Sequence, residues 1–104
     1  MNDYILKIYP RAFQDLEDIL DYISEDLKNK SAALRLAEKF EEIFETLCRF
    51  PQSYPLSRNE AVAKKGLRKA VLEKYLIFYY ADEEKRQIEV VHIACGYRDY
   101  YELL

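Results

Sequence analysis

The chain has 104 residues and half of them are hydrophobic, which suits one domain with one compact core. Charged residues make up 34%, and only 2 glycines and 3 prolines are present, so a disordered or collagen-like chain is excluded. The chain has no run of about 18 apolar residues, no signal-peptide pattern and no closely spaced cysteine pair. We therefore expect a single cytoplasmic domain over residues 1–104, with reduced thiols and no membrane partner.

The net charge of −3 is unevenly distributed. Residues 1–57 carry 7 basic and 11 acidic side chains, whereas residues 58–74 carry 6 basic and 2 acidic ones. This local positive excess is compatible with an anionic partner and equally with a solvated loop.

Residues 4–9 are rich in aliphatic and aromatic side chains and are followed by Pro10, which predicts a short strand and then the start of a helix. From Phe13 to Leu27 apolar residues recur at steps of three and four, and the acidic residues lie largely off that stripe. This periodicity predicts a first amphipathic helix.

A break at residues 28–30 separates this helix from a second one. Ser31 is the predicted N-cap of the second helix, and Pro51 ends it. Because the connection is only about three residues long, the two helices are expected to form an antiparallel hairpin.

A loop is predicted over residues 51–65, and the composition of the chain changes after it. Three β-branched or aromatic runs follow it, at residues 67–72, 75–81 and 87–94. The short polar stretches between these runs suit hairpin turns. The predicted fold is therefore α+β, with the order β-α-α-β-β-β and an antiparallel sheet packed against the helical hairpin.

The sequence lacks the residues that most kinds of enzyme chemistry need. His92 is the only histidine and lies within an apolar strand, so we expect a packing role for it and neither a metal site nor a cofactor. Two glycines cannot form a phosphate-binding loop. Cys95 has no nearby base in the sequence, and we expect it to be a small buried residue.

Alternation along the middle strand of the predicted meander separates its side chains into two sets. One face carries Tyr75, Ile77 and Tyr79, and the other carries Leu76, Phe78 and Tyr80. Both sets are largely apolar. If one meets the helices, the other is expected to be an exposed apolar surface of the kind that marks a protein-binding site.

Residues 96–104 combine aromatic, arginine and aspartate side chains directly after a strand. This composition is typical of recognition surfaces. A terminal helical turn, in which Arg98 and Asp99 pair with neighbours, explains it equally well.

Five short segments, spread in order along nearly the whole chain, form a recognisable pattern. They are Ala12-x-x-Asp15-Leu16-x-x-Ile19-x-x-Tyr22-Ile23, Phe50-Pro51, Gly66-Leu67-Arg68, Tyr75-Leu76-Ile77-Phe78-Tyr79 and Gly96-Tyr97-Arg98-Asp99-Tyr100. In this order and spacing they resemble the RelE/ParE superfamily, the toxins of bacterial type II toxin–antitoxin modules of the plasmid-stabilisation type. The fold of that superfamily matches the element order predicted above.

The resemblance implies a growth-inhibiting protein that a cognate antitoxin neutralises. Members similar to RelE cut messenger RNA in the ribosome, and members similar to ParE inhibit DNA gyrase. In a RelE-like protein the resemblance makes Arg68, Lys69, Arg98 and Tyr101 the catalytic residues. The residues expected to contact the target or the antitoxin are Leu76, Phe78, Tyr80, Tyr97, Arg98 and Tyr100.

The chain departs from the ribonuclease pattern at three positions. Leu76, Val71 and Cys95 stand where those members commonly have an arginine, another basic residue and a histidine. A net charge of −3 is also a poor fit to an RNA surface, because nucleic-acid binding is driven by positive charge. These features favour a ParE-like toxin that binds its target. The RelE-like ribonuclease and a degenerate, non-toxic binding module remain as alternatives.

Overall fold

The computed structural model describes residues 3–54, 56 and 66–95. Its elements in chain order are β1 (Ile5–Ile8), α1 (Pro10–Asp21) with a π-helical continuation (Tyr22–Asp26), α2 (Lys30–Arg49), β2 (Arg68–Leu72), β3 (Tyr75–Asp82) and β4 (Gln87–Cys95). The predicted α+β class and the order β-α-α-β-β-β are confirmed.

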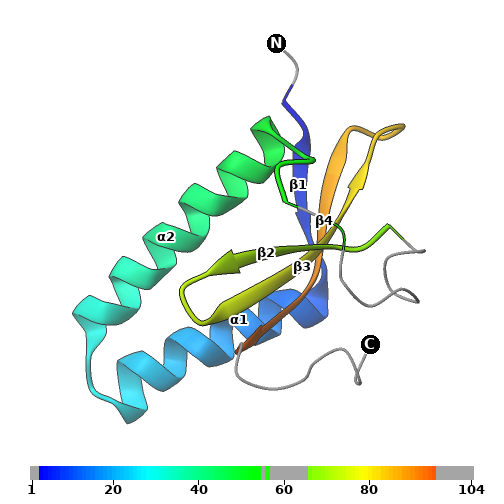
Figure 1. The fold of residues 1–104 in the computed structure, drawn as a ribbon. Coiled ribbons are helices and arrows are strands. Elements are labelled where there is room, and N and C mark those ends of the chain that lie inside the picture. The colour runs from blue at the N-terminus through cyan, green and yellow to red at the C-terminus, as the bar shows by residue number, and fades with distance from the viewer. Residues whose placement is uncertain (1–2, 55, 57–65, 96–104) are drawn as a thin grey trace.

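The four strands form one sheet in the order β1-β4-β3-β2 (Figure 1). β2, β3 and β4 make the predicted antiparallel meander, with a two-residue turn between Leu72 and Tyr75. β1 differs from the prediction because it pairs with β4 in parallel, from Ile5 opposite Gln87 to Ile8 opposite Val90. A parallel pair needs a long crossover connection, and the helical hairpin is part of the one used here. The sheet is therefore mixed.

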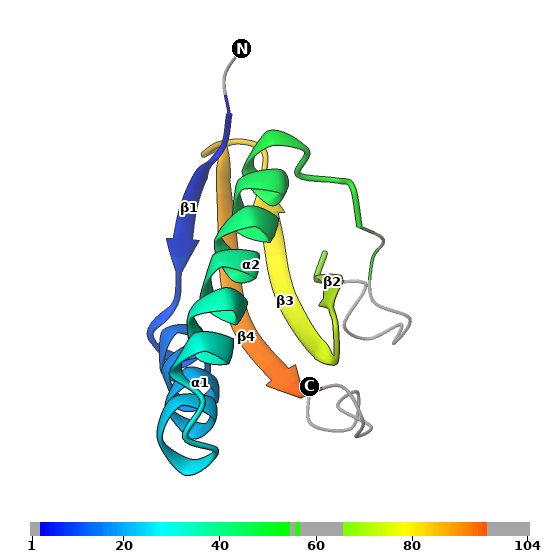
Figure 2. The ribbon, with the colours of Figure 1, turned by 90° about the vertical axis from the view of Figure 1, so that its left-hand side faces the viewer.

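One face of the sheet is covered by α2, which runs along the strands and lies in front of β4 in Figure 2. Its apolar residues recur at steps of three and four because that spacing keeps them on one side of a helix. The buried core that they form with α1 and the sheet contains Ala12, Leu36, Phe40, Ile43, Phe44, Leu47, Ala70, Tyr75, Ile77, Tyr79, Ile88, Val90 and Ile93. The predicted face of Tyr75, Ile77 and Tyr79 is thus the face that meets the helices.

The connection between the two helices differs in one detail from the prediction. α1 ends in a wide turn in which the Leu27 N–H donates to the Tyr22 carbonyl at 3.0 Å, and Lys28 then adopts a positive φ of 52°. The side chain of Asn29, not Ser31, caps α2 by accepting the Ala32 N–H at 3.1 Å. Asparagine and serine are comparable caps, so composition alone does not separate them.

On the sheet face away from α2, a smaller buried cluster consists of Leu67, Phe78 and Ala94. Phe78 has an exposed fraction of 0%, and its ring stacks on that of His92 at a centroid distance of 5.8 Å. The expectation that Phe78 lies on an exposed apolar surface is therefore wrong. Alternation places it correctly on this face, but packing against its neighbours removes it from solvent. Leu76 and Tyr80 flank it and are half-buried.

Candidate functional site

The two predicted basic residues of β2 lie on opposite faces of the sheet. Arg68 pairs with Tyr79, whose side chain faces α2, and Lys69 pairs with Phe78, whose side chain faces away from it. The guanidinium Nη1 of Arg68 donates to the carbonyl oxygen of Tyr54 at 2.6 Å. Arg68 therefore holds the segment that follows α2, and it does not converge with Lys69 on one point.

Tyr79 holds the same segment from the core. Its side chain is fully buried, and its hydroxyl donates to the Pro51 carbonyl at 3.1 Å. Burial raises the pKa of Tyr79 to about 12, and the nearby Arg68 guanidinium offsets only part of that effect. A phenol in this setting stays neutral at physiological pH, so its role is to donate a structural hydrogen bond.

A polar contact between α1 and β4 was not anticipated from the sequence. Oδ2 of Asp15 lies 2.7 Å from Nδ1 of His92 and accepts the backbone N–H of Ile93 at 3.1 Å. The Asp15 and His92 side chains are both largely buried. His92 thus has the packing role expected of it, on the ring of Phe78, together with an acidic partner 77 residues away in the chain.

We use the term outer sheet face for the side of the sheet away from α2, with Lys69, Leu76, Phe78, Tyr80, Glu89 and His92 on it. At one end of this face the Tyr9 hydroxyl donates to Oε1 of Glu89 at 3.2 Å. Partial burial and the neighbouring Glu89 carboxylate raise the pKa of Tyr9. The outer sheet face therefore combines half-exposed aromatic and aliphatic side chains with a few fixed polar groups.

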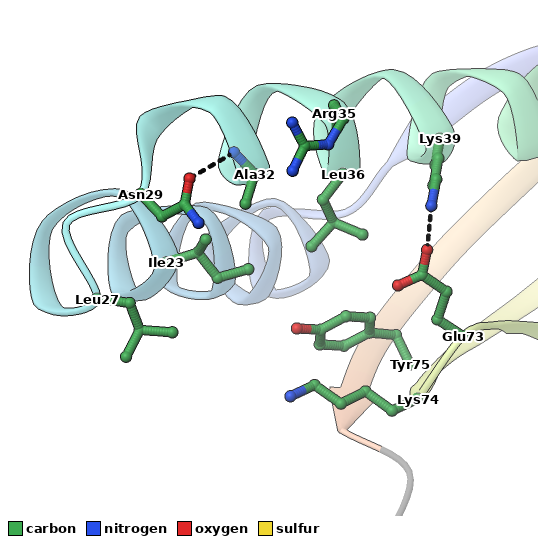
Figure 3. Close-up of a pocket in the computed structure, with 10 residues that line it drawn as sticks. All are labelled: Ile23, Leu27, Asn29, Ala32, Arg35, Leu36, Lys39, Glu73, Lys74 and Tyr75. Carbon is green, nitrogen blue, oxygen red and sulfur yellow. Dashed lines mark hydrogen bonds and ion pairs between the residues drawn. The ribbon is translucent and has the colours of Figure 1, made fainter.

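A separate hollow of about 370 Å³ opens between the helical hairpin and the β2–β3 turn (Figure 3). It is lined by Ile23, Leu27, Asn29, Ala32, Arg35, Leu36, Lys39, Glu73, Lys74 and Tyr75. Only Tyr75 among them belongs to a β-strand. No sequence pattern indicates this hollow, because its wall combines residues of the helical hairpin with residues 73–75, which are distant along the chain.

Residues 6–100 match the family model described as the ParE toxin of the type II toxin–antitoxin system parDE. The chain belongs to the ParE toxin family. No curated protein sequence gives a significant match.

Solved structures share the ParE-family fold at low sequence identity. The chromosomal ParDE system from P. aeruginosa aligns with a TM-score of 0.70 and 21% identity over 88% of this chain and 95% of that one. The RelBE2 toxin–antitoxin complex from Mycobacterium tuberculosis gives 0.66 and 22%, over 91% and 93%. The intact E. coli RelBE complex gives 0.53 and 18%, over 91% and 99%. These likenesses establish the fold.

Several of the predicted site residues of this ParE-family chain lie outside the described residues. They are Tyr97, Arg98, Tyr100 and Tyr101. Within the described ranges, the three departures from the ribonuclease pattern have defined places. Val71 is half-exposed on β2, and Leu76 is half-buried on the outer sheet face. Cys95 is exposed at the end of β4, so the expectation that it is buried is wrong.

Two further classes of site were sought in the described part of the chain. No group of three or more His, Cys, Asp or Glu side chains there is placed to hold a metal ion. No helix in the same ranges is long and apolar enough to span a membrane.

Proposed function

We propose that this ParE-family toxin inhibits growth by binding a protein target, DNA gyrase, and that a cognate antitoxin neutralises it. The observation that supports a binding mode most directly is the arrangement of Arg68 and Lys69. A ribonuclease needs several cationic groups aimed at one phosphate, where negative charge develops during cleavage. Here Arg68 is engaged by the Tyr54 carbonyl, and Lys69 lies on the other side of the sheet.

The net charge of the chain and the apolar residues at positions 71 and 76 also favour a protein target over an RNA target. The chain has a net charge of −3, and Leu76 and Val71 are apolar where a ribonuclease-like member has cationic groups. Binding to an RNA surface gains free energy by releasing counterions from phosphates, which an acidic protein does poorly. A protein target makes no such demand.

The outer sheet face is the surface proposed for the target. Leu76 and Tyr80 are half-buried there, beside the fully buried Phe78, which fixes the strand beneath them. Partly exposed tyrosine and aliphatic side chains on a rigid sheet resemble the central part of a protein interface, because they bury large areas at low entropic cost. The tail residues Tyr97, Arg98 and Tyr100 are proposed to extend this surface.

An antitoxin is proposed because the solved relatives named above are toxin–antitoxin complexes. The open edge of β1 offers one place for it. β1 pairs only with β4 within the described residues, and its Ile5 side chain is 69% exposed. An extended partner segment can add to such an edge through main-chain hydrogen bonds.

Induction of the chain in cells that lack the antitoxin tests the proposed target. We expect growth arrest in which plasmid supercoiling changes before any fragment of translated mRNA is detected, and direct inhibition of purified gyrase by the purified chain. Early mRNA cleavage at intact supercoiling would replace the proposal with the RelE-like ribonuclease. Unimpaired growth at high expression would replace it with the non-toxic binding module.

A further inference from the structure

The hollow shown in Figure 3, which we call the hairpin pocket, gathers three cationic side chains and a phenolic hydroxyl over an apolar floor. Its walls are the end of α1, the first three turns of α2 and the β2–β3 turn. Its volume of about 370 Å³ matches small ligand pockets, which start at about 300 Å³.

The cationic side of the pocket has more positive groups than it uses internally. Arg35 and Lys39 lie one turn apart on α2, so both face the pocket. Lys39 forms an ion pair with Glu73. Arg35 is exposed and has no acidic partner within residues 3–54, 56 and 66–95, and Lys74 adds a third cation from the turn. An anion entering the pocket therefore meets a guanidinium that is not already neutralised.

Tyr75 provides an independent indication of a ligand. Its side chain is only 6% exposed, and its ring packs on Phe40 at a centroid distance of 5.8 Å. Its hydroxyl nevertheless points into the pocket in Figure 3 and makes no hydrogen bond to any part of the chain that the structure describes. Burial raises the pKa of Tyr75, so the hydroxyl keeps its proton and is available as a donor.

The opposite wall of the pocket is aliphatic. Ile23, Leu27 and Leu36 line it, and Leu27 is 56% exposed at the end of the wide turn of α1. An apolar side chain that covers the exposed Leu27 and the half-buried Ile23 removes apolar surface from water, which stabilises the complex. The pocket thus presents carboxylate-binding groups and an apolar surface within one side chain's reach of each other.

We propose that the hairpin pocket binds an acidic side chain of the antitoxin together with an adjacent aliphatic side chain of the same segment. Arg35 and Lys74 hold the carboxylate, the Tyr75 hydroxyl donates to it, and the aliphatic side chain covers Ile23 and Leu27. This inference rests on the proposed function in taking the antitoxin as the occupant. Arginine is suited to this role because its planar fork can donate two parallel hydrogen bonds to a carboxylate.

A polypeptide fits this pocket better than a nucleic acid does. A phosphate backbone would satisfy Arg35 and Lys74 but would leave the aliphatic wall uncovered. The chain as a whole is acidic, with a net charge of −3, which weakens its attraction for a polyanion. A short acidic and apolar segment satisfies both walls at once.

The test compares four variants in binding to the protein encoded by the reading frame beside this gene, measured by calorimetry on purified proteins. Arg35→Glu places a negative charge against the carboxylate and should weaken binding about 10- to 100-fold. Tyr75→Phe removes only the hydroxyl and should weaken binding about 3- to 10-fold. Arg35→Gln should lie between wild type and Arg35→Glu. Arg11→Glu is the matched control, because Arg11 is exposed on α1 and lines none of the described pockets.

The outcomes separate this inference from the proposal on which it rests. A wild-type chain that does not bind the neighbouring protein overturns both. Tight wild-type binding that Arg35→Glu and Tyr75→Phe leave unchanged overturns the pocket alone, with the toxin–antitoxin assignment intact. Binding of a 20-nucleotide single strand that Arg35→Glu abolishes would also overturn it, in favour of a nucleic-acid site. Far-ultraviolet circular dichroism and thermal melts establish that each variant is folded.

Discussion

The carboxylate of Asp15 in α1 lies 2.7 Å from Nδ1 of His92 in β4, and the same oxygen accepts the N–H of the next residue, Ile93. β1 pairs with β4 only as far as Val90, so the later part of β4 has no strand beside it on that edge. A buried backbone N–H without an acceptor is costly. The Asp15 carboxylate therefore supplies the acceptor that a longer β1 would have supplied, and this contact connects α1 to the sheet.

The first prediction concerns this joint. Asp15→Ala removes the acceptor of a partly buried N–H and the acidic partner of His92, and should lower the free energy of unfolding by about 2–3 kcal/mol. Urea denaturation followed by circular dichroism measures the change. Asp21→Ala is the control on the same helix, since Asp21 is exposed, and it should change stability by less than about 0.5 kcal/mol. Equal effects of the two substitutions would show that the Asp15 contacts add no stability.

The second prediction treats Arg68 as a structural residue. Arg68→Gln removes the hydrogen bond to the Tyr54 carbonyl and should destabilise the fold by about 1–2 kcal/mol, because a charge-assisted hydrogen bond is lost. Arg35→Gln is the matched control, since Arg35 is exposed and should cost less than about 0.5 kcal/mol. Growth arrest should persist for Arg68→Gln at temperatures where it is folded. Loss of toxicity in a fully stable variant would instead support a catalytic arginine.

The third prediction distinguishes folding from binding on the outer sheet face. Phe78→Ala creates a cavity at a side chain with 0% exposure and should cost about 3–5 kcal/mol. Tyr80→Ala, at the half-buried neighbour, should cost less stability and should weaken target binding instead. Denaturation and gyrase inhibition, measured on the same samples, separate the two effects. A stable Phe78→Ala chain with impaired inhibition would return Phe78 to the contact surface.

The sequence predicted most of the fold because periodicity is a local property. The spacing of Leu36, Phe40 and Leu47 determines the buried side of α2, and alternation in β3 separates Ile77 from Phe78. The parallel pairing of β1 is not predictable from the local pattern of Ile5–Ile8, because the pairing direction depends on where the crossover returns the chain. The cap was misplaced by two residues because Asn29 and Ser31 are chemically comparable.

The candidate site was less predictable, because convergence in space is not visible in a linear pattern. Arg68 and Lys69 are adjacent in sequence, yet neighbouring residues of a strand point to opposite faces of the sheet. Asp15 and His92 meet across 77 residues, and Arg35 and Tyr75 line the same pocket only because α2 packs on the sheet. Burial was also misjudged at Phe78, since exposure depends on the neighbours that a side chain acquires and not on its own hydropathy.

The fourth prediction is a loss of stability at high pH that depends on Tyr79. Burial raises its pKa in the folded protein to about 12, whereas an exposed tyrosine titrates at about 10. Since the neutral phenol is favoured in the fold, its stabilisation is complete below about pH 10 and is lost as the pH rises towards about 12. Between pH 9 and pH 11.5 the wild type should lose about 1–2 kcal/mol more than Tyr79→Phe, measured by urea denaturation at each pH.

The comparison with Tyr79→Phe isolates this residue from the other groups that titrate in the same range. Tyr75 also has a raised pKa and shifts stability in the same direction, but it is present in both proteins. Tyr79→Phe should itself be less stable at pH 7 by about 1 kcal/mol, because the hydrogen bond to the Pro51 carbonyl is lost. The stabilities of the two proteins should therefore converge as the pH rises, and the two curves should meet or cross by about pH 11.5. Parallel curves would mean that the Tyr79 hydroxyl ionises as readily in the fold as in the unfolded chain.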